Sequence, residues 1–295
     1  MNASERHHFV PQWYLRNFCD PITGMVQVYD KQKSTYRRQK PREIMFINRY
    51  YRQEWAPEGI DPDIFEKMLS TGVEGPGKLA LQRLITMPSD FRAEETVAIM
   101  CYLAFQRLRV PRQARWARMV MEQSLLQMLA PELKSHFLDG TIEMTEGYRF
   151  RFMKEMLRPV ISWFCRMRWN IFETAQDVQF ITTDSPVSFF NVSFPPPAEA
   201  GIGFVGTKVL FPISPHLMLI MSHPEYDGGS ETIDPLTRLE EPKTEDGGVQ
   251  VVFQPPLPAE AVRTFNSCMF RLSDRIVVSQ SKSSLEKCVV DTPPW

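Results

Sequence analysis

The sequence lacks the motifs that would place it quickly in a functional class. It contains no G-x-x-x-x-G-K-S/T loop, no G-x-G-x-x-G, no H-E-x-x-H and no G-x-S-x-G. Each of these motifs has a mechanical role in nucleotide binding, metal binding or nucleophilic catalysis. Their absence weakens four interpretations: nucleoside triphosphatase, simple Rossmann enzyme, zinc protease and α/β-hydrolase. Their absence does not exclude an enzyme whose active site uses a less familiar motif.

The chain also has almost no net charge, and it lacks clustered cysteines and long apolar runs. The 34 Lys and Arg residues balance 35 Asp and Glu residues, so no overall field attracts nucleic acid or anionic lipid. The five cysteines show no C-x-x-C spacing, which argues against a zinc knuckle and fits a reducing compartment. The longest apolar run, Val97 to Phe105, is far shorter than the roughly 20 residues of a membrane span. Without a secretory signal pattern either, we expect a cytoplasmic protein.

What the chain does have is enough apolar sequence for a large core. With 295 residues, 43% of them hydrophobic, it can bury a substantial interior. The patterns predict an α+β fold in one composite domain, with a central helical block and a mixed or antiparallel β-sheet. A small N-terminal β segment at about 1–55, a helical block at about 62–166 and a β-rich part at about 168–295 make up this domain.

Apolar periodicity predicts the individual elements. Helices are expected over 63–87 with a break at 75–77, then up to residue 110, over 113–129 and over 148–166, where Pro159 should break or kink the helix. Short β-type runs at 26–30 and beyond residue 170 predict strands, the later ones forming one mixed sheet. The segment 227–248, rich in Asp, Glu, Gly, Thr and Pro, is expected to be a mobile loop. A helix over 258–273 and a strand over 276–279 follow.

The segment HHFVPQWYLRNF at residues 7–18 resembles the N-terminal signature of a known family. It is similar to the H-x-V-P-x-x-Y-L-x-x-F pattern of the uncharacterised, mostly bacterial family called domain of unknown function 4238. Further similar segments follow in the same order along the chain: Gln106 and Arg109-Val110-Pro111, residues 180–187, residues 212–215, Asn266, and residues 274–279. The resemblance implies membership of that family, and it supplies no activity, cofactor or catalytic residue.

His7 and His8 are the most distinctive local feature of this segment. Imidazoles beside an acidic or phosphate-binding site can act as acid, base or metal ligand. Adjacent residues in an extended chain point in opposite directions, so at most one of them is expected to face a site. The structural alternative is that the segment packs against the core while a histidine bonds to the backbone.

Gln106 and Arg109 lie three residues apart and therefore share one face of the predicted helix. Together they can bind a phosphate or carboxylate group. The alternative for the arginines in this region is that they complement the negative C-terminal end of the helix. These arginines also bear on the interpretation of the chain as a nucleic-acid-binding protein. That interpretation would need a basic surface patch built from Arg37, Arg38, Lys40, Arg107, Arg109 and Arg112.

Asp184 and Ser185 follow a β-type run and precede a proline, which predicts a turn at a strand end. Strand ends often carry functional side chains, although Asp and Ser are also ordinary turn residues. The leading hypothesis is an intracellular hydrolase acting on a phosphate-containing or nucleic-acid substrate, with phosphodiesterase or nuclease chemistry as the form to test. In it, His7 or His8 is the acid/base, Asp184 a base or metal ligand, and Gln106, Arg109, Ser185 and Asn266 bind substrate. A divalent metal is the cofactor that this hypothesis would allow.

The rival hypothesis is a non-enzymatic binding or regulatory module, with the N-terminal segment as a structural clasp and the 227–248 loop as the partner contact.

Overall fold

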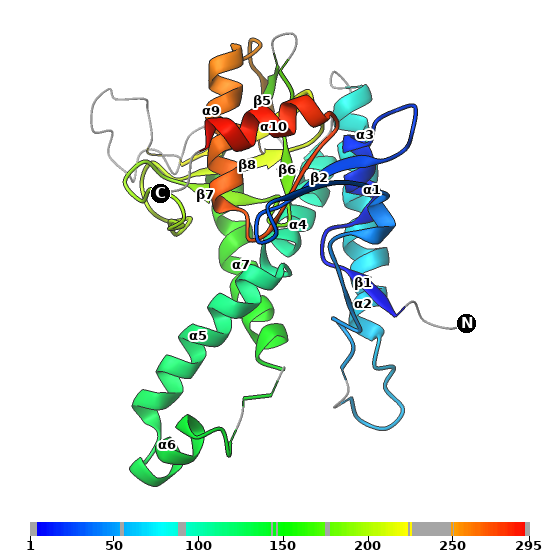
Figure 1. Cartoon of the computed structure of the whole chain (residues 1–295). Coiled ribbons are helices and arrows are strands. Elements are labelled where there is room, and N and C mark those ends of the chain that lie inside the picture. The colour runs from blue at the N-terminus through cyan, green and yellow to red at the C-terminus, as the bar shows by residue number, and fades with distance from the viewer. Residues whose placement is uncertain are drawn as a thin grey trace.

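The fold is α+β, as a computed structural model of the chain shows (Figure 1). The structure describes residues 5–53, 56–87, 93–142, 144–145, 147–174, 178–223, 225, 249 and 251–292. The expected loop at 227–248 lies outside these residues. In the described part of the chain, none of the helices has both the length and the apolarity that crossing a membrane requires.

The N-terminal segment begins with a short strand that runs into a helical turn. His7 and His8 lie on the strand, which pairs antiparallel with a second short strand, and Pro11 ends the extended stretch. The elements are β1 (Arg6–His8), α1 (Gln12–Leu15), η1 (Arg16–Phe18), the 3-10 turn η2 (Pro41–Glu43) and β4 (Phe46–Asn48). Tyr14, Leu15 and Phe18 are fully buried, so this segment is part of the core.

The helical block forms the middle of the chain. Its central helix, α4, is flanked by α3 and α7, and Figure 1 shows α5 and α6 projecting away from the sheets. The elements are α2 (Ile64–Met68), the π-helical turn η3 (Leu69–Glu74), α3 (Gly75–Thr86), α4 (Ala93–Leu108), α5 (Pro111–Met128), α6 (Pro131–Leu138) and α7 (Tyr148–Arg166). Helix α7 continues through Pro159, where the sequence predicted a break or kink.

The strands beyond the helical block divide between two sheets, where the sequence predicted one. A five-stranded sheet has the order β10-β5-β9-β8-β7, and a four-stranded sheet has the order β3-β2-β11-β6. The strands are β2 (Val26–Asp30), β3 (Thr35–Gln39), β5 (Arg168–Glu173), β6 (Thr182–Thr183), β7 (Ser188–Phe190), β8 (Lys208–Pro212), β9 (Leu217–Ser222), β10 (Val251–Phe253) and β11 (Ile276–Ser279). The second sheet therefore joins strands from both ends of the chain.

Two C-terminal helices pack against each other and against the second sheet. Helix α9 (Ala259–Leu272) buries Val262, Asn266, Met269 and Leu272, whose spacing of three or four residues places them on one face. Helix α10 (Lys282–Asp291) is capped by Ser281, whose hydroxyl accepts a hydrogen bond from the backbone N–H of Ser284. The helix over 258–273 was predicted from this periodicity, whereas α10 was not.

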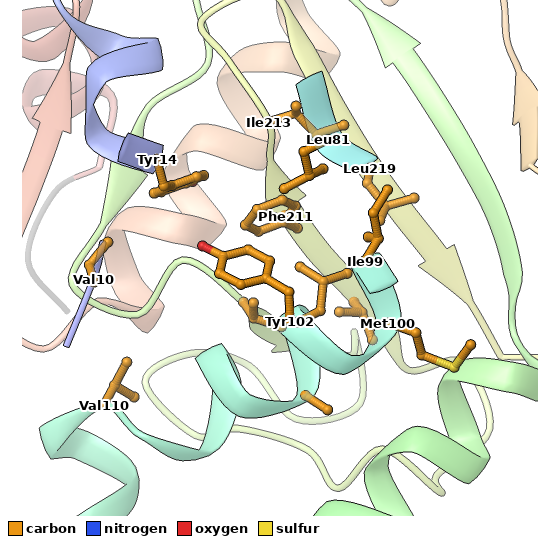
Figure 2. Packing of buried hydrophobic residues seen from close by; sticks show 14 of the residues in the cluster. Val10, Tyr14, Leu81, Ile99, Met100, Tyr102, Val110, Phe211, Ile213 and Leu219 are labelled. Atoms are coloured by element: carbon orange, nitrogen blue, oxygen red, sulfur yellow. The ribbon is translucent and has the colours of Figure 1, made fainter. Parts of the chain in front are cut away.

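One cluster of buried apolar side chains contains residues from all three expected parts of the chain. Val10, Tyr102 and Phe211 belong to it, and Figure 2 shows the Tyr102 hydroxyl pointing toward the side where Val10 and Tyr14 lie. The aromatic rings of Tyr14 and Phe211 stack with their centroids 5.2 Å apart. A core shared in this way is what a single composite domain requires, and the division into domains stays a prediction.

Candidate functional site

His7 and His8 differ in their surroundings. The His7 ring is buried and stacks on the Tyr51 ring, and its Nδ1 accepts a hydrogen bond of 2.9 Å from the backbone N–H of Tyr51. His8 faces the other way on β1, with its Nδ1 3.5 Å from the side-chain amide of Gln12. Burial lowers the pKa of His8, so the ring is neutral at neutral pH. His7 thus anchors the segment to the backbone, and the catalytic role predicted for His7 or His8 stays a prediction.

Gln106 and Arg109 form one hydrogen-bonded unit at the end of α4. The Gln106 amide donates to the carbonyl oxygen of Phe9 at 2.9 Å, which ties α4 to the N-terminal segment. The Gln106 carbonyl oxygen accepts hydrogen bonds from Arg109 Nε at 3.0 Å and Nη2 at 2.6 Å. Both side chains are buried. The predicted pairing on one helix face is therefore present, and Gln106 orients the guanidinium.

Arg109 also forms an ion pair with Glu74, the last residue of the π-helical turn η3. The Arg109 Nη1 atom lies 2.6 Å from Glu74 Oε1, and the indole N–H of Trp13 donates to Glu74 Oε2 at 3.3 Å. Burial alone would lower the pKa of Arg109, but the attraction of Glu74 holds that pKa above its ordinary value. The guanidinium is therefore charged at every physiological pH.

Glu66 on α2 completes the charged cluster, and sequence reasoning did not single it out. Burial and the like charge of Glu74 raise the pKa of Glu66 to about 7, and Arg109 offsets part of that shift. A carboxyl with a pKa near neutrality can both give and accept a proton under physiological conditions. In the sequence, Glu66 reads as one more charge on an amphipathic helix, so no local signal marks it.

A small cavity lies beside Arg109. Two guanidinium groups line it, because Arg149 on α7 faces it as well. Arg149 lies over the Tyr50 ring at 4.3 Å from its centroid and donates to the Tyr50 carbonyl oxygen at 2.6 Å. The full lining consists of Tyr50, Tyr51, Leu108, Arg109, Ala114, Arg149, Phe150, Phe152 and Met153.

Two tyrosine hydroxyls near this cluster are buried without a hydrogen-bond partner among the described residues. Tyr51 lines the cavity, and Tyr102 packs its ring against Trp13, which contacts Glu74. Burial raises the pKa of both phenols, while the nearby Arg109 acts in the opposite direction. A buried hydroxyl without a partner costs free energy. At each of these two hydroxyls, a water molecule or a ligand could supply the missing hydrogen bond.

Asp184 lies in a second hydrogen-bonded network. Its carboxylate accepts hydrogen bonds from the backbone N–H groups of Asp274, Arg275 and Ile276 at 2.7 to 2.9 Å. Burial raises its pKa to about 6, with the three hydrogen bonds acting against that shift. Asp184 thus fastens the turn before β11 to β6, and its predicted catalytic role stays a prediction.

The Ser185 backbone and the Asn266 side chain are hydrogen-bonded within the protein, whereas the Ser185 hydroxyl is buried without a partner among the described residues. The Ser185 N–H donates to the Thr183 hydroxyl, and the Ser185 carbonyl accepts from the Ser188 hydroxyl. Asn266 accepts from the N–H of Ile181 at 3.1 Å and donates to the carbonyl of Gln179 at 2.9 Å. Their predicted roles in substrate binding stay predictions too.

Two further expectations concern metal ions and nucleic acid. Within the described ranges, no group of three or more His, Cys, Asp or Glu side chains is placed to hold a metal ion. Arg107 and Arg109 are only 6% and 3% exposed, and Arg107 pairs with Glu199 at 2.5 Å. A basic surface patch of the kind considered above would thus have to form without these two arginines.

Comparison with known proteins gives one result. No curated protein and no solved structure matches the chain. A family model described as "Protein of unknown function (DUF4238)" matches residues 6–283. This range begins at the first residue of β1 and includes every residue of the Arg109 cluster and of the Asp184 network. The protein therefore belongs to the DUF4238 family.

Proposed function

We propose that this protein is a hydrolase acting on a phosphate-containing substrate that binds beside Arg109. The observation that carries the proposal is the presence of two guanidinium groups, those of Arg109 and Arg149, on the wall of one cavity. Arginine matches the geometry of phosphate oxygens, and aromatic side chains complete the cavity wall.

Glu66 is the group we assign as acid/base, with His8 as a second candidate. Hydrolysis of a phosphate ester needs a proton taken from water or given to the leaving oxygen, and a pKa near the working pH suits both tasks. The pKa of Glu66 is raised to about 7 by burial and by Glu74. His8 is neutral because burial lowers its pKa, so it would act as a base.

The test is hydrolysis of simple phosphate monoesters and diesters by the full chain, with and without Mg²⁺ or Mn²⁺. We expect Glu66→Gln to lower kcat by about 10²-fold or more, the usual size of an acid/base contribution. Glu132→Gln, at an exposed carboxylate on α6, is the matched control and should leave kcat unchanged. Equal kcat values for Glu66→Gln and wild type would rule out the assignment of Glu66.

The non-enzymatic alternative also has a specific observation in its favour. Several side chains of the N-terminal segment bond to distant backbone, as a structural clasp would. The Tyr14 hydroxyl donates to the Pro212 carbonyl at 2.6 Å, and the Asn17 amide donates to the Ile213 carbonyl at 3.1 Å. A wild-type protein that neither binds phosphate nor hydrolyses any ester would favour this alternative, and the search would then turn to binding partners.

A further inference from the structure

The donors of Arg109 are directed at two acceptors inside the protein. The Nε and Nη2 atoms donate to the side-chain oxygen Oε1 of Gln106, and Nη1 donates to the Glu74 carboxylate. Gln106 cannot move easily, because its amide is fixed to the Phe9 carbonyl. These bonds use three of the five N–H groups of the guanidinium, and an anion in the place of the Glu74 carboxylate would accept from Nη1.

Glu74 is the more movable member of the ion pair. Its side chain is 19% exposed, against 2% for Arg109, so it lies on the solvent side of the pair. Its second oxygen is held only by the long hydrogen bond from Trp13, at 3.3 Å. Glu74 also ends a π-helical turn, a rare helix type that is frequently found at functional sites.

The hydroxyls of Tyr51 and Tyr102 supply two further donors near this position. Both are buried and lack a partner in the part of the chain that the structure describes. Tyr51 lines the cavity together with Arg109, and the Tyr102 ring centroid lies 5.0 Å from that of Trp13, whose indole N–H donates to Glu74. A carboxylate has two oxygens, and those of Glu74 are already used by Arg109 and Trp13. A phosphoryl group has three terminal oxygens and can reach more donors.

We propose that the phosphoryl group of the substrate replaces the Glu74 carboxylate on Arg109 and accepts hydrogen bonds from the hydroxyls of Tyr51 and Tyr102. This binding mode rests on the proposed function, because Arg109 and Tyr51 line the cavity in which the substrate is placed. Glu74 is then a resident anion that keeps the buried guanidinium paired until substrate arrives. Such pairing matters because an uncompensated buried charge is strongly destabilising.

The test is isothermal titration calorimetry of the full chain with inorganic phosphate. We expect Glu74→Gln to bind phosphate about tenfold more tightly than wild type, because a neutral amide competes less well for a guanidinium than a carboxylate. The double variant Tyr51→Phe/Tyr102→Phe should bind about tenfold more weakly, because it removes two donors. Glu199→Gln is the matched control: it breaks another buried Arg–Glu pair, that with Arg107, and should leave phosphate affinity unchanged.

The outcomes separate this binding mode from the proposed reaction. If wild type binds phosphate and Glu74→Gln binds it no more tightly, the replacement of Glu74 is overturned and the proposed function stands. If no variant binds phosphate, both are overturned. The predicted affinities without any ester hydrolysis would support the binding mode and remove the hydrolase. Should Glu74→Gln fail to fold, Glu74→Asp decides: its shorter carboxylate should yield about threefold tighter binding, and no gain overturns the inference.

Discussion

Gly77 on α3 lies directly against Tyr102 on α4. A Cβ atom at Gly77 would stand 2.6 Å from the Cβ and 3.0 Å from the Cγ of Tyr102. These atoms are close to the α4 backbone, so rotation of the tyrosine side chain cannot relieve the overlap. The two helices approach this closely because position 77 has no side chain.

Substituting Gly77 by Ala should therefore destabilise the protein. Alanine favours a helix over glycine by about 1 kcal/mol, but overpacking of a well-packed contact costs typically 1–3 kcal/mol and should prevail. Urea denaturation measures the difference. Gly72→Ala is the matched control, since nothing lies within 4 Å of a Cβ atom there, and it should be neutral or stabilising. A stability for Gly77→Ala equal to that of Gly72→Ala would contradict the close packing.

Two buried tyrosines should respond in opposite ways to loss of the hydroxyl. The Tyr14 hydroxyl lies 2.7 Å from the Thr182 hydroxyl and 2.6 Å from the Pro212 carbonyl, so Tyr14→Phe should cost about 1–3 kcal/mol. The Tyr102 hydroxyl has no partner among the described residues, so Tyr102→Phe should cost nothing or stabilise the ligand-free protein. Thermal denaturation of both variants, measured side by side, checks this contrast in stability. Equal losses of stability would count against it.

Removing the Asp184 carboxylate should be strongly destabilising. Asp184→Ala leaves three backbone N–H groups, at residues 274–276, without their acceptor, and each buried unsatisfied donor costs about 1–3 kcal/mol. We expect a total loss of about 3 kcal/mol or more in urea denaturation. Asp291→Ala, at an exposed position on α10, should change stability by less than about 0.5 kcal/mol. A small effect at Asp184 would mean that these hydrogen bonds contribute little.

Glu66 should make the stability of the protein depend on pH. Its pKa is about 7 in the folded protein against 4.5 for the ordinary side chain, so folding favours the protonated form. The folded state therefore loses stability as the pH rises from about 4.5 to about 7, and the loss is complete above that window. Glu66→Gln cannot lose a proton, so its stability relative to wild type should be greater at about pH 8 than at about pH 5. Parallel pH profiles for the two proteins would contradict the raised pKa.

Local patterns predicted the α+β class and most helices, because burial of one helix face leaves a periodic trace. The expected helices over 148–166 and 258–273 correspond closely to α7 and α9. Helix α6 is different: its described side chains are largely exposed, so it leaves no strong apolar stripe. The division into two sheets could not be predicted either, because strand pairing between distant segments has no local signature.

The candidate site was predictable in part for a similar reason. The spacing of Gln106 and Arg109 on one helix face is a local property, and the structure brings the two side chains together. The special character of Glu66 depends on burial and on Glu74, which are consequences of tertiary packing. Likewise, the sequence motif that contains Asp184 marks the residue, but only the fold reveals that its carboxylate meets the backbone N–H groups after α9.

The four-stranded sheet has a consequence for how the protein is made. Its β2 and β11 strands are neighbours, and the side chains of Asp30 and Arg275, 245 residues apart, form a bidentate hydrogen-bonded pair across them. During synthesis, β2 leaves the ribosome long before its partner exists, since chains grow at about 5–20 residues per second. The hairpin of β2 and β3 therefore spends many seconds with the β11-facing edge of β2 unpaired. Until β11 has been synthesised, this edge can pair with a strand of another chain, so the interval is one in which aggregation competes with folding.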